Sequence, residues 1–211
     1  MKKLLLIIVM LSLSKLLSAQ VVIPEKPLTA ITAITEVKIT GGVWQRLILL
    51  NGKYELDMFD ASPLELFFGE ADEITEKDTI RYLYKNLGLI IVLEQRIDRW
   101  TNTKKERIVE FTLTNQFGFA PPISLGGKLS FASTHTDFIN SGWFEFPFID
   151  KDTIITWSAR GGPSEIYVFD DNGHLTAITY IMASIDELEV RFTNKGFTYI
   201  REQIANGFYD D

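Results

Sequence analysis

Three successive β-forming segments, separated by turn signals, constrain the fold of this chain most. Residues 79–84 (TIRYLY), 89–95 (LIIVLEQ) and 108–114 (IVEFTLT) are rich in the branched and aromatic side chains that strands favour. Asn86-Leu87-Gly88 supplies a turn between the first two, and the polar stretch 98–106 supplies the next. The sequence therefore predicts an antiparallel meander, in which the apolar run LIIVL is a central strand covered on both faces.

A tight hairpin and a short helix are predicted before this meander. Asn51-Gly52 lies between two apolar segments, and both residues tolerate the positive φ that a type I′ turn needs. Further along, Ser62-Pro63-Leu64-Glu65 predicts an N-cap, a proline at the first helical position and a capping-box Glu, with Gly69 as the stop. The predicted helix spans 63–68, with Leu64, Phe67 and Phe68 as its apolar face.

These patterns predict an α+β fold, built mainly of antiparallel β-meander units with a few short helices. The tetrapeptide KDTI recurs at 77–80 and 151–154, each time at the start of a predicted strand. Two similar helix-on-sheet modules are therefore one alternative, and a single unrepeated domain is the other. The predicted organisation is a signal peptide at 1–19, an extended leader at 20–43, a first α+β unit at 44–116, a connector at 117–148 and a second β-rich unit with a C-terminal helix at 149–211.

Two apolar patterns support the later boundaries. Phe144, Phe146 and Phe148 alternate, which predicts one buried face of a strand. The helical spacing near the C-terminus predicts a helix with a stop at Asn206-Gly207. The residues at that spacing are Phe197, Ile200, Ile204 and Phe208.

The N-terminal segment has the layout of a secretory signal peptide. Lysines precede an apolar run at 4–13, and the small residues Ser18 and Ala19 precede Gln20. The run is shorter than the roughly 20 apolar residues of a membrane-spanning helix. We therefore expect export to the periplasm or the cell exterior, with cleavage after Ala19, rather than a retained anchor. The chain contains no cysteine, which excludes disulfides and a lipidated N-terminal cysteine.

The charge of the chain disfavours nucleic acid as a partner. The formal net charge is -7, and loss of Lys2, Lys3 and Lys15 with the signal peptide would make it more negative. Phosphate recognition requires a basic surface instead. The local basic patch at 104–107 (KKER) is interpreted as a solvated loop between strands.

The acidic segment 170–174 (DDNGH) is interpreted as a turn rather than a calcium loop. An EF-hand with Asn172 and Gly173 at its fifth and sixth positions would place Val168 first and Thr179 twelfth, where carboxylates are required. By contrast, Asp, Asn and Gly between two β-forming segments are typical of a hairpin turn.

Other catalytic patterns are absent or incomplete in the sequence. GGKLS at 126–130 lacks the spacing and the Ser/Thr of a phosphate loop, and there is no cysteine nucleophile. With only His135 and His174, a three-histidine zinc site is impossible. His135 and Asp137 would alternate onto one strand face, where surface pairing is the favoured interpretation over a catalytic pair. No catalytic residue, metal ligand or cofactor is predicted.

The segments PLELFFGEADEI, YLYKNLGLIIVL and IVEFTL resemble exported bacterial domains of unknown function. The shared pattern is a helix, a Gly-x-[Pro/Ala]-Asp turn, a Tyr-rich strand and a Gly-Leu strand, over residues 44–115. The pattern is also similar to the small outer-membrane assembly lipoprotein module, although this chain lacks the lipidated cysteine. The matching positions are Gly69, Ala71, Asp72, Tyr82, Tyr84, Gly88 and Leu89. The resemblance implies an envelope or secreted module with no described activity.

Two functional hypotheses follow. The first is an exported, non-catalytic module that binds a protein or a glycan of the cell envelope through aromatic and turn residues at the rim of its sheet. The second is a carboxylate-dependent hydrolase, for example one acting on glycosides, without a local motif. The scarcity of histidine and the absence of cysteine favour the first, and enzymatic activity is left open.

Export gives the first testable prediction. N-terminal sequencing of the protein isolated from the cell that makes it should begin at or near Gln20, because Ser18 and Ala19 form the small-residue cleavage site. A full-length product in the cytoplasmic fraction, starting at Met1, would contradict the assignment.

Overall fold

The computed structural model describes residues 22–38, 46–77, 79–97, 102–125, 127–142, 147–149, 151–156 and 164–181. The predicted signal peptide and the predicted C-terminal helix lie outside the described residues. Phe144 and Phe146 lie outside them as well.

The smaller of two sheets is antiparallel and has three strands in the order β1-β2-β3. Its strands are β1 (Ile34–Lys38), β2 (Arg46–Leu50) and β3 (Tyr54–Asp57). Asn51 and Gly52 have φ of 54° and 66°, and the Lys53 N–H donates to the Leu50 carbonyl at 3.1 Å. The predicted hairpin turn between β2 and β3 is therefore confirmed.

The side chain of Asn51 ties the preceding segment to this turn. Its Oδ1 accepts the Thr32 N–H at 2.7 Å, and its Nδ2 donates to the Ala30 carbonyl at 2.9 Å. Ile31, between these two contacts, is fully buried. The segment predicted as an extended leader thus contributes both β1 and a core side chain.

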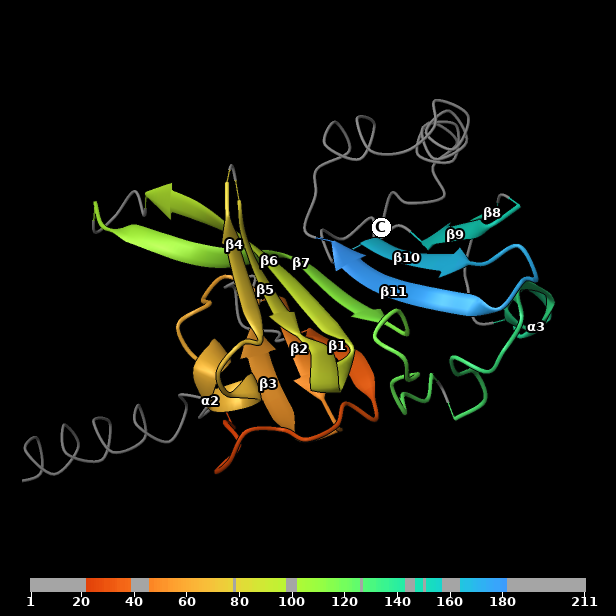
Figure 1. The fold of residues 1–211 in the computed structure, drawn as a ribbon, viewed down its shortest axis with the longest axis horizontal. Helices are drawn as coiled ribbons and strands as arrows, with labels where there is room; N and C mark the ends of the chain where they lie inside the picture. The colour runs from red at the N-terminus through yellow and green to blue at the C-terminus, as the bar shows by residue number, and fades with distance from the viewer. Residues whose placement is uncertain are drawn as a thin grey trace, which may run out of the picture.

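The larger sheet is antiparallel throughout and has the strand order β4-β5-β6-β7-β11-β10-β9-β8 among the described residues. Its first four strands are β4 (Glu73–Glu76), β5 (Ile80–Tyr84), β6 (Leu89–Ile97) and β7 (Lys104–Thr114). The others are β8 (Phe148–Ile149), β9 (Thr153–Thr156), β10 (Ser164–Phe169) and β11 (Leu175–Ile181). Each half is a meander preceded by a short helix, α2 or α3, and the last strands of the halves pair (Figure 1). The chain is mostly β with few helices, as predicted.

Helix α2 (Leu64–Phe68) packs its apolar face on the larger sheet, where the Phe68 and Phe111 ring centroids lie 6.1 Å apart. Burial of Leu64, Phe67 and Phe68 and the stop at Gly69 (φ 76°) are as predicted.

The predicted start of α2 is wrong. Pro63 occupies the N-cap, and no side chain caps the helix. The N–H of Ser62 instead donates to Asp60 Oδ1 at 2.9 Å, so Ser62 belongs to the preceding turn. The capping box expected from Ser62 and Glu65 therefore does not form.

Helix α3 (His135–Asn140) replaces the strand predicted for His135 and Asp137. Thr134 is its N-cap, and Asp137 completes a capping box, accepting the Thr134 N–H at 2.8 Å and donating its own N–H to the Thr134 hydroxyl at 3.2 Å. The buried Phe138 ring packs 5.3 Å from Tyr167, on the core face of the second half.

The core runs between the two layers and follows one face of the larger sheet. Leu89, Ile91 and Leu93 of β6 are essentially inaccessible, and Ile90 on the opposite face is 6% exposed. β6 is thus a central strand covered on both faces, as predicted for LIIVL. A 3-10 turn, η1 (Lys85–Leu87), and Gly88 join β5 to β6, which confirms the predicted turn.

Gly88 gives a prediction about folding stability. It has φ of 61°, and a Cβ there would lie 2.5 Å from the Thr114 carbonyl oxygen and 2.8 Å from Pro121 Cγ. Gly88→Ala should lower the free energy of unfolding by about 2 to 4 kcal/mol, from backbone strain and overpacking together.

Gly52→Ala is the matched control, since Gly52 has φ of 66° with nothing near its Cβ position. It should cost only about 1 to 2 kcal/mol. Equal costs for the two variants in urea unfolding would contradict the steric argument.

Candidate functional site

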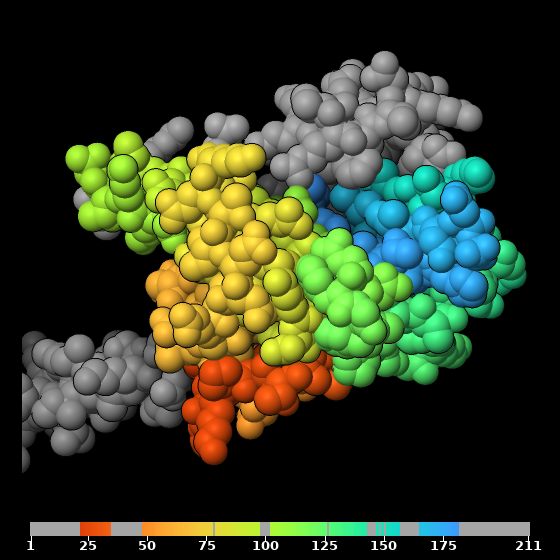
Figure 2. Space-filling view, in the orientation of Figure 1, coloured from red at the N-terminus to blue at the C-terminus, as the bar shows by residue number. Residues whose placement is uncertain are grey.

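The β6–β7 hairpin extends beyond its neighbouring strands as an arm (Figure 1). We use "the arm" for residues 94–97 and 104–107, whose pairs run from Glu94 with Arg107 to Ile97 with Lys104. The connection between β6 and β7 falls within 98–106, as predicted, although residues 98–101 lie outside the described ones. The connection is shorter than predicted, and the interpretation of 104–107 as a solvated loop is wrong, because residues 104–107 are strand. The arm stands out from the body in Figure 2.

Glu94 organises the charges on one face of the arm. Its Oε2 lies 2.7 Å from Arg107 Nη2 and 3.1 Å from Arg96 Nε. Partial burial acts to raise the pKa of Glu94, but the hydrogen bonds and charges of Arg107 and Arg96 outweigh it and lower the pKa. Arg107 is therefore neutralised locally.

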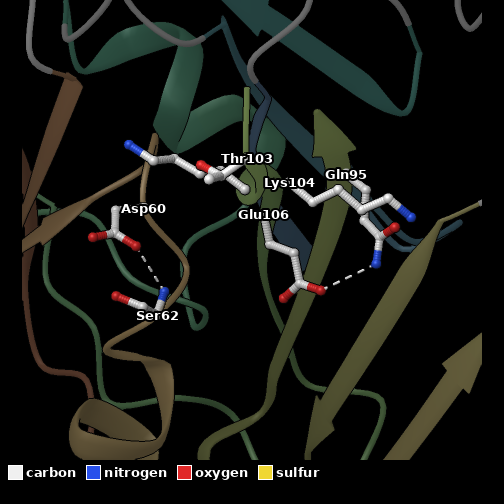
Figure 3. A pocket seen from close by; sticks show the side chains of 7 residues that line it. Asp60, Ser62, Gln95, Thr103, Lys104 and Glu106 are labelled. Atoms are coloured by element: carbon white, nitrogen blue, oxygen red, sulfur yellow. Dashed lines mark hydrogen bonds between the residues drawn. The ribbon is translucent and has the colours of Figure 1, made fainter. Parts of the chain in front are cut away.

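An open cleft of about 480 Å³, here called the arm cleft, lies between the arm and the loop that joins β3 to α2. Figure 3 shows Asp60 and Ser62 on one side and Gln95, Lys104 and Glu106 on the other. Its lining is completed by Thr103 and Lys105. No pattern in the sequence predicts that these two segments lie side by side.

Backbone hydrogen bonds fix the two walls of the arm cleft relative to each other. The Ala61 N–H donates to the Glu106 carbonyl at 3.0 Å, and the Ile108 N–H donates to the Met58 carbonyl at 2.7 Å. These bonds join the β3–α2 loop to β7 at the base of the arm. The cleft is therefore positioned by the sheet rather than by a free loop.

The polar groups of the arm cleft can both donate and accept hydrogen bonds. The Asp60 carboxylate accepts the Ser62 N–H at 2.9 Å, and Glu106 Oε1 accepts from the Gln95 amide at 3.3 Å (Figure 3). Lys104 adds a positive charge beside these two acids. Such a lining suits recognition of polar groups, because it offers charges of both signs and includes no aliphatic or aromatic residue.

The segment 170–174 is the hairpin turn that the sequence predicts. Gly173 has φ of 77°, and Asp170 Oδ1 accepts the N–H groups of His174 at 2.8 Å and of Asn172 at 2.9 Å. These bonds, that of His174 foremost, hold the pKa of Asp170 below its usual range. Asp170 therefore serves the turn. Within the described ranges, no three His, Asp or Glu side chains gather closely enough to hold a metal ion.

His135 and Asp137 do not alternate on a strand, as the sequence predicts, but lie in α3 and have separate roles there. Asp137 caps the helix, and the N–H and hydroxyl of Thr134 lower its pKa. The ring of His135 packs edge-on against Phe169 at 4.8 Å, and its Nε2 has no hydrogen-bond partner among the described residues. In the GGKLS segment, Leu129 is buried and Lys128 is exposed.

Two of the residues that carry the family resemblance line a second cavity, here called the α2 cavity, of about 240 Å³. Asp72 and Tyr84 line it, together with Phe68 of α2 and Leu87 of η1. Burial first, then the charges of Tyr82 and Glu65, raise the pKa of Tyr84 to about 12. The sequence places Asp72 and Tyr84 at turn and strand positions but does not indicate a cavity.

Comparison with models of known protein families, with curated proteins and with solved structures finds no match to this chain. The family resemblance therefore stays a prediction. In the part of the chain that the structure describes, no helix is long and apolar enough to cross a membrane.

The 170–174 turn allows a test that separates a structural role from a metal-binding role. Gly173→Val forces a β-branched residue into a positive φ. The added Cβ would also lie 4.0 Å from the Cβ of His135, so the substitution should lower the free energy of unfolding by about 1 to 3 kcal/mol. Asp171→Asn should leave the unfolding temperature nearly unchanged.

The addition of calcium distinguishes the structural role from the metal-binding role. It should not shift the unfolding temperature of the wild type or of Asp171→Asn. A rise of several degrees that Asp171→Asn abolishes would establish ion binding to the native state and overturn the turn assignment.

Proposed function

We propose that this chain is an exported, non-catalytic binding protein that uses the arm and the arm cleft to hold a protein or a glycan of the cell envelope. The observation that carries this proposal is a difference between the two halves of the larger sheet. The arm is an extension that the second half lacks.

The two halves share an irregularity at corresponding places. A bulge in the β6–β7 pairing leaves Val109 outside the register, and one in β10–β11 does the same to Thr176. Beyond its bulge, β10–β11 closes in the 170–174 turn. β6–β7 instead continues to the pair of Ile97 and Lys104.

This correspondence supports two similar helix-on-sheet modules as the finer description of the fold. Each module is a short helix followed by four meandering strands, and the repeated KDTI precedes or enters β5 and β9. The modules meet at Thr112 and Thr179, which are directly paired and whose hydroxyl oxygens lie 2.9 Å apart. An antiparallel pair of equivalent strands is related by a two-fold axis through such a point.

The arm has the properties of a contact surface. Ile97 is 63% exposed at the outer end of the arm, and Lys104, its paired residue on β7, lines the arm cleft. An exposed apolar side chain beside a polar cleft offers both packing and hydrogen bonds to one partner. The cleft contains no aromatic platform, so polar side chains rather than ring stacking would provide the specificity.

One observation favours the hydrolase as a second candidate. The arm cleft contains two carboxyl groups, those of Asp60 and Glu106, on opposite walls. Against this, Asp60 is exposed and both acids already accept hydrogen bonds. A glycosidase acid must stay protonated near neutral pH, which usually requires burial.

The test is affinity capture from an envelope extract with the purified exported protein as bait. Lys104→Glu should reduce recovery of the specific partner about tenfold, because it removes a donor and adds a third acid to the cleft. Lys128→Glu makes the same charge change on an exposed lysine away from the arm and should recover the partner as well as wild type does.

Equal recovery with both variants would contradict a role for the arm cleft. The hydrolase alternative is tested in the same extract by release of reducing ends from the glycan fraction. Release that disappears in Glu106→Gln would replace the binding proposal with the enzymatic one.

A further inference from the structure

The base of the α2 cavity is apolar and aromatic. Phe68, Tyr84 and Leu87 are only 6%, 3% and 5% exposed, and the rings of Phe68 and Tyr84 lie 5.5 Å apart between centroids. Leu28, from the N-terminal segment, completes this part of the lining. Its position is fixed because its N–H donates to the Phe67 carbonyl at 2.7 Å. The cavity is thus assembled from three separate parts of the chain.

The mouth of the α2 cavity is acidic. The exposed side chains of Glu70 and Asp72 line it, and no lysine or arginine is among the lining residues. Asp72 Oδ2 accepts the backbone N–H of Lys85 at 2.6 Å, which fixes the orientation of this carboxylate. Among the described residues, neither acid forms an ion pair. Two negative charges therefore stand uncompensated at the rim of an apolar pocket.

One polar group also reaches the cavity from its aromatic base. Tyr84 is only 3% exposed and lines the cavity, and its hydroxyl makes no hydrogen bond to any described residue but is accessible to solvent. A ligand in the cavity can therefore form a hydrogen bond with this hydroxyl. The pocket thus offers a hydroxyl in addition to carboxylates and ring faces.

This combination selects a particular ligand chemistry. The carboxylates attract a cation, and the apolar base favours an organic cation over an inorganic one. The aliphatic and aromatic base suits an alkyl stem, which lysine-like groups bury while keeping the ammonium group in water. An anion would be repelled, and among the described residues no third carboxylate or imidazole joins the two acids to hold a bare metal ion.

We propose that the α2 cavity binds a primary alkylammonium group, supplied either by a free alkylamine or by a lysine side chain. The ammonium group lies between Glu70 and Asp72, and the alkyl stem lies on Phe68 and Leu87. This site is separate from the arm cleft, and the experiments below test it independently of the function proposed for that cleft.

The binding test uses three probes in titrations of the purified protein followed by calorimetry or amide chemical shifts. Pentylamine and Nα-acetyl-lysine methylamide represent the two sources of the ammonium group. We expect saturable binding with Kd of about 1 mM for the better probe, as the efficiency of so small a ligand allows. Binding of pentylamine alone identifies a free-amine site, and binding of the lysine derivative identifies a side-chain site.

The third probe, 1-pentanol, has a similar shape without the charge and should bind at least about tenfold more weakly. Equal affinity for pentanol would show a merely apolar pocket and overturn the proposal. Failure of both amines to saturate at tens of millimolar, well above the Kd of about 1 mM expected here, would overturn it as well.

Variants locate the site. Glu70→Gln and Asp72→Asn should each weaken amine binding about fivefold or more, since each removes one of two charges at the mouth. Asp72→Asn retains an oxygen that can accept the Lys85 N–H, so folding should be preserved. Unchanged affinity in both variants would overturn the assignment.

Glu73→Gln is the matched control. Glu73 is the exposed first residue of β4, close in sequence to Asp72 but outside the lining of the cavity. Its removal should change the Kd less than about twofold. A loss equal to that of Glu70→Gln would mean general attraction to an acidic surface, and the proposal would be withdrawn.

Discussion

The pairing of β7 with β11 is the interaction on which the rest of the structure depends. It joins two meanders that are otherwise far apart in the sequence, through directly paired residues such as Phe111 with Tyr180 and Leu113 with Ile178. The Phe111 and Tyr180 rings also meet edge-on at 6.5 Å. Because these four side chains are all buried, the pairing makes one continuous core out of two halves.

That continuity gives the arm a firm base from which to project. The backbone bonds from Ala61 and Ile108 fix this base, and Glu94 with its two arginines links the strands at the inner end of the arm. Exposed ion pairs of this kind contribute only about 0.2 to 1 kcal/mol each. The stability of the arm therefore comes mainly from the pairing of its strands. Its exposed side chains contribute little to stability and are available for contact with a partner.

Local signals predicted those parts of the fold that local geometry decides. The turns at Asn51, Gly88 and Gly173 follow from positive φ, and the core strand LIIVL follows from its apolar run. The start of α2 was mispredicted because Asp60 competes for the N–H of Ser62, and the arm was missed because polar strand residues resemble a loop. Neither cavity was predictable, since each combines segments whose proximity only tertiary structure determines.

The distribution of these features between the halves has its own logic. The arm, the arm cleft and the α2 cavity all belong to the β4–β7 half or to the segments packed on it. In the other half, the carboxylates discussed above have structural roles, since Asp137 caps α3 and Asp170 closes the β10–β11 turn. The β6–β7 hairpin can extend beyond its neighbours because β7 is already paired with β11 along its inner residues, so the outer residues are not needed to join the two halves.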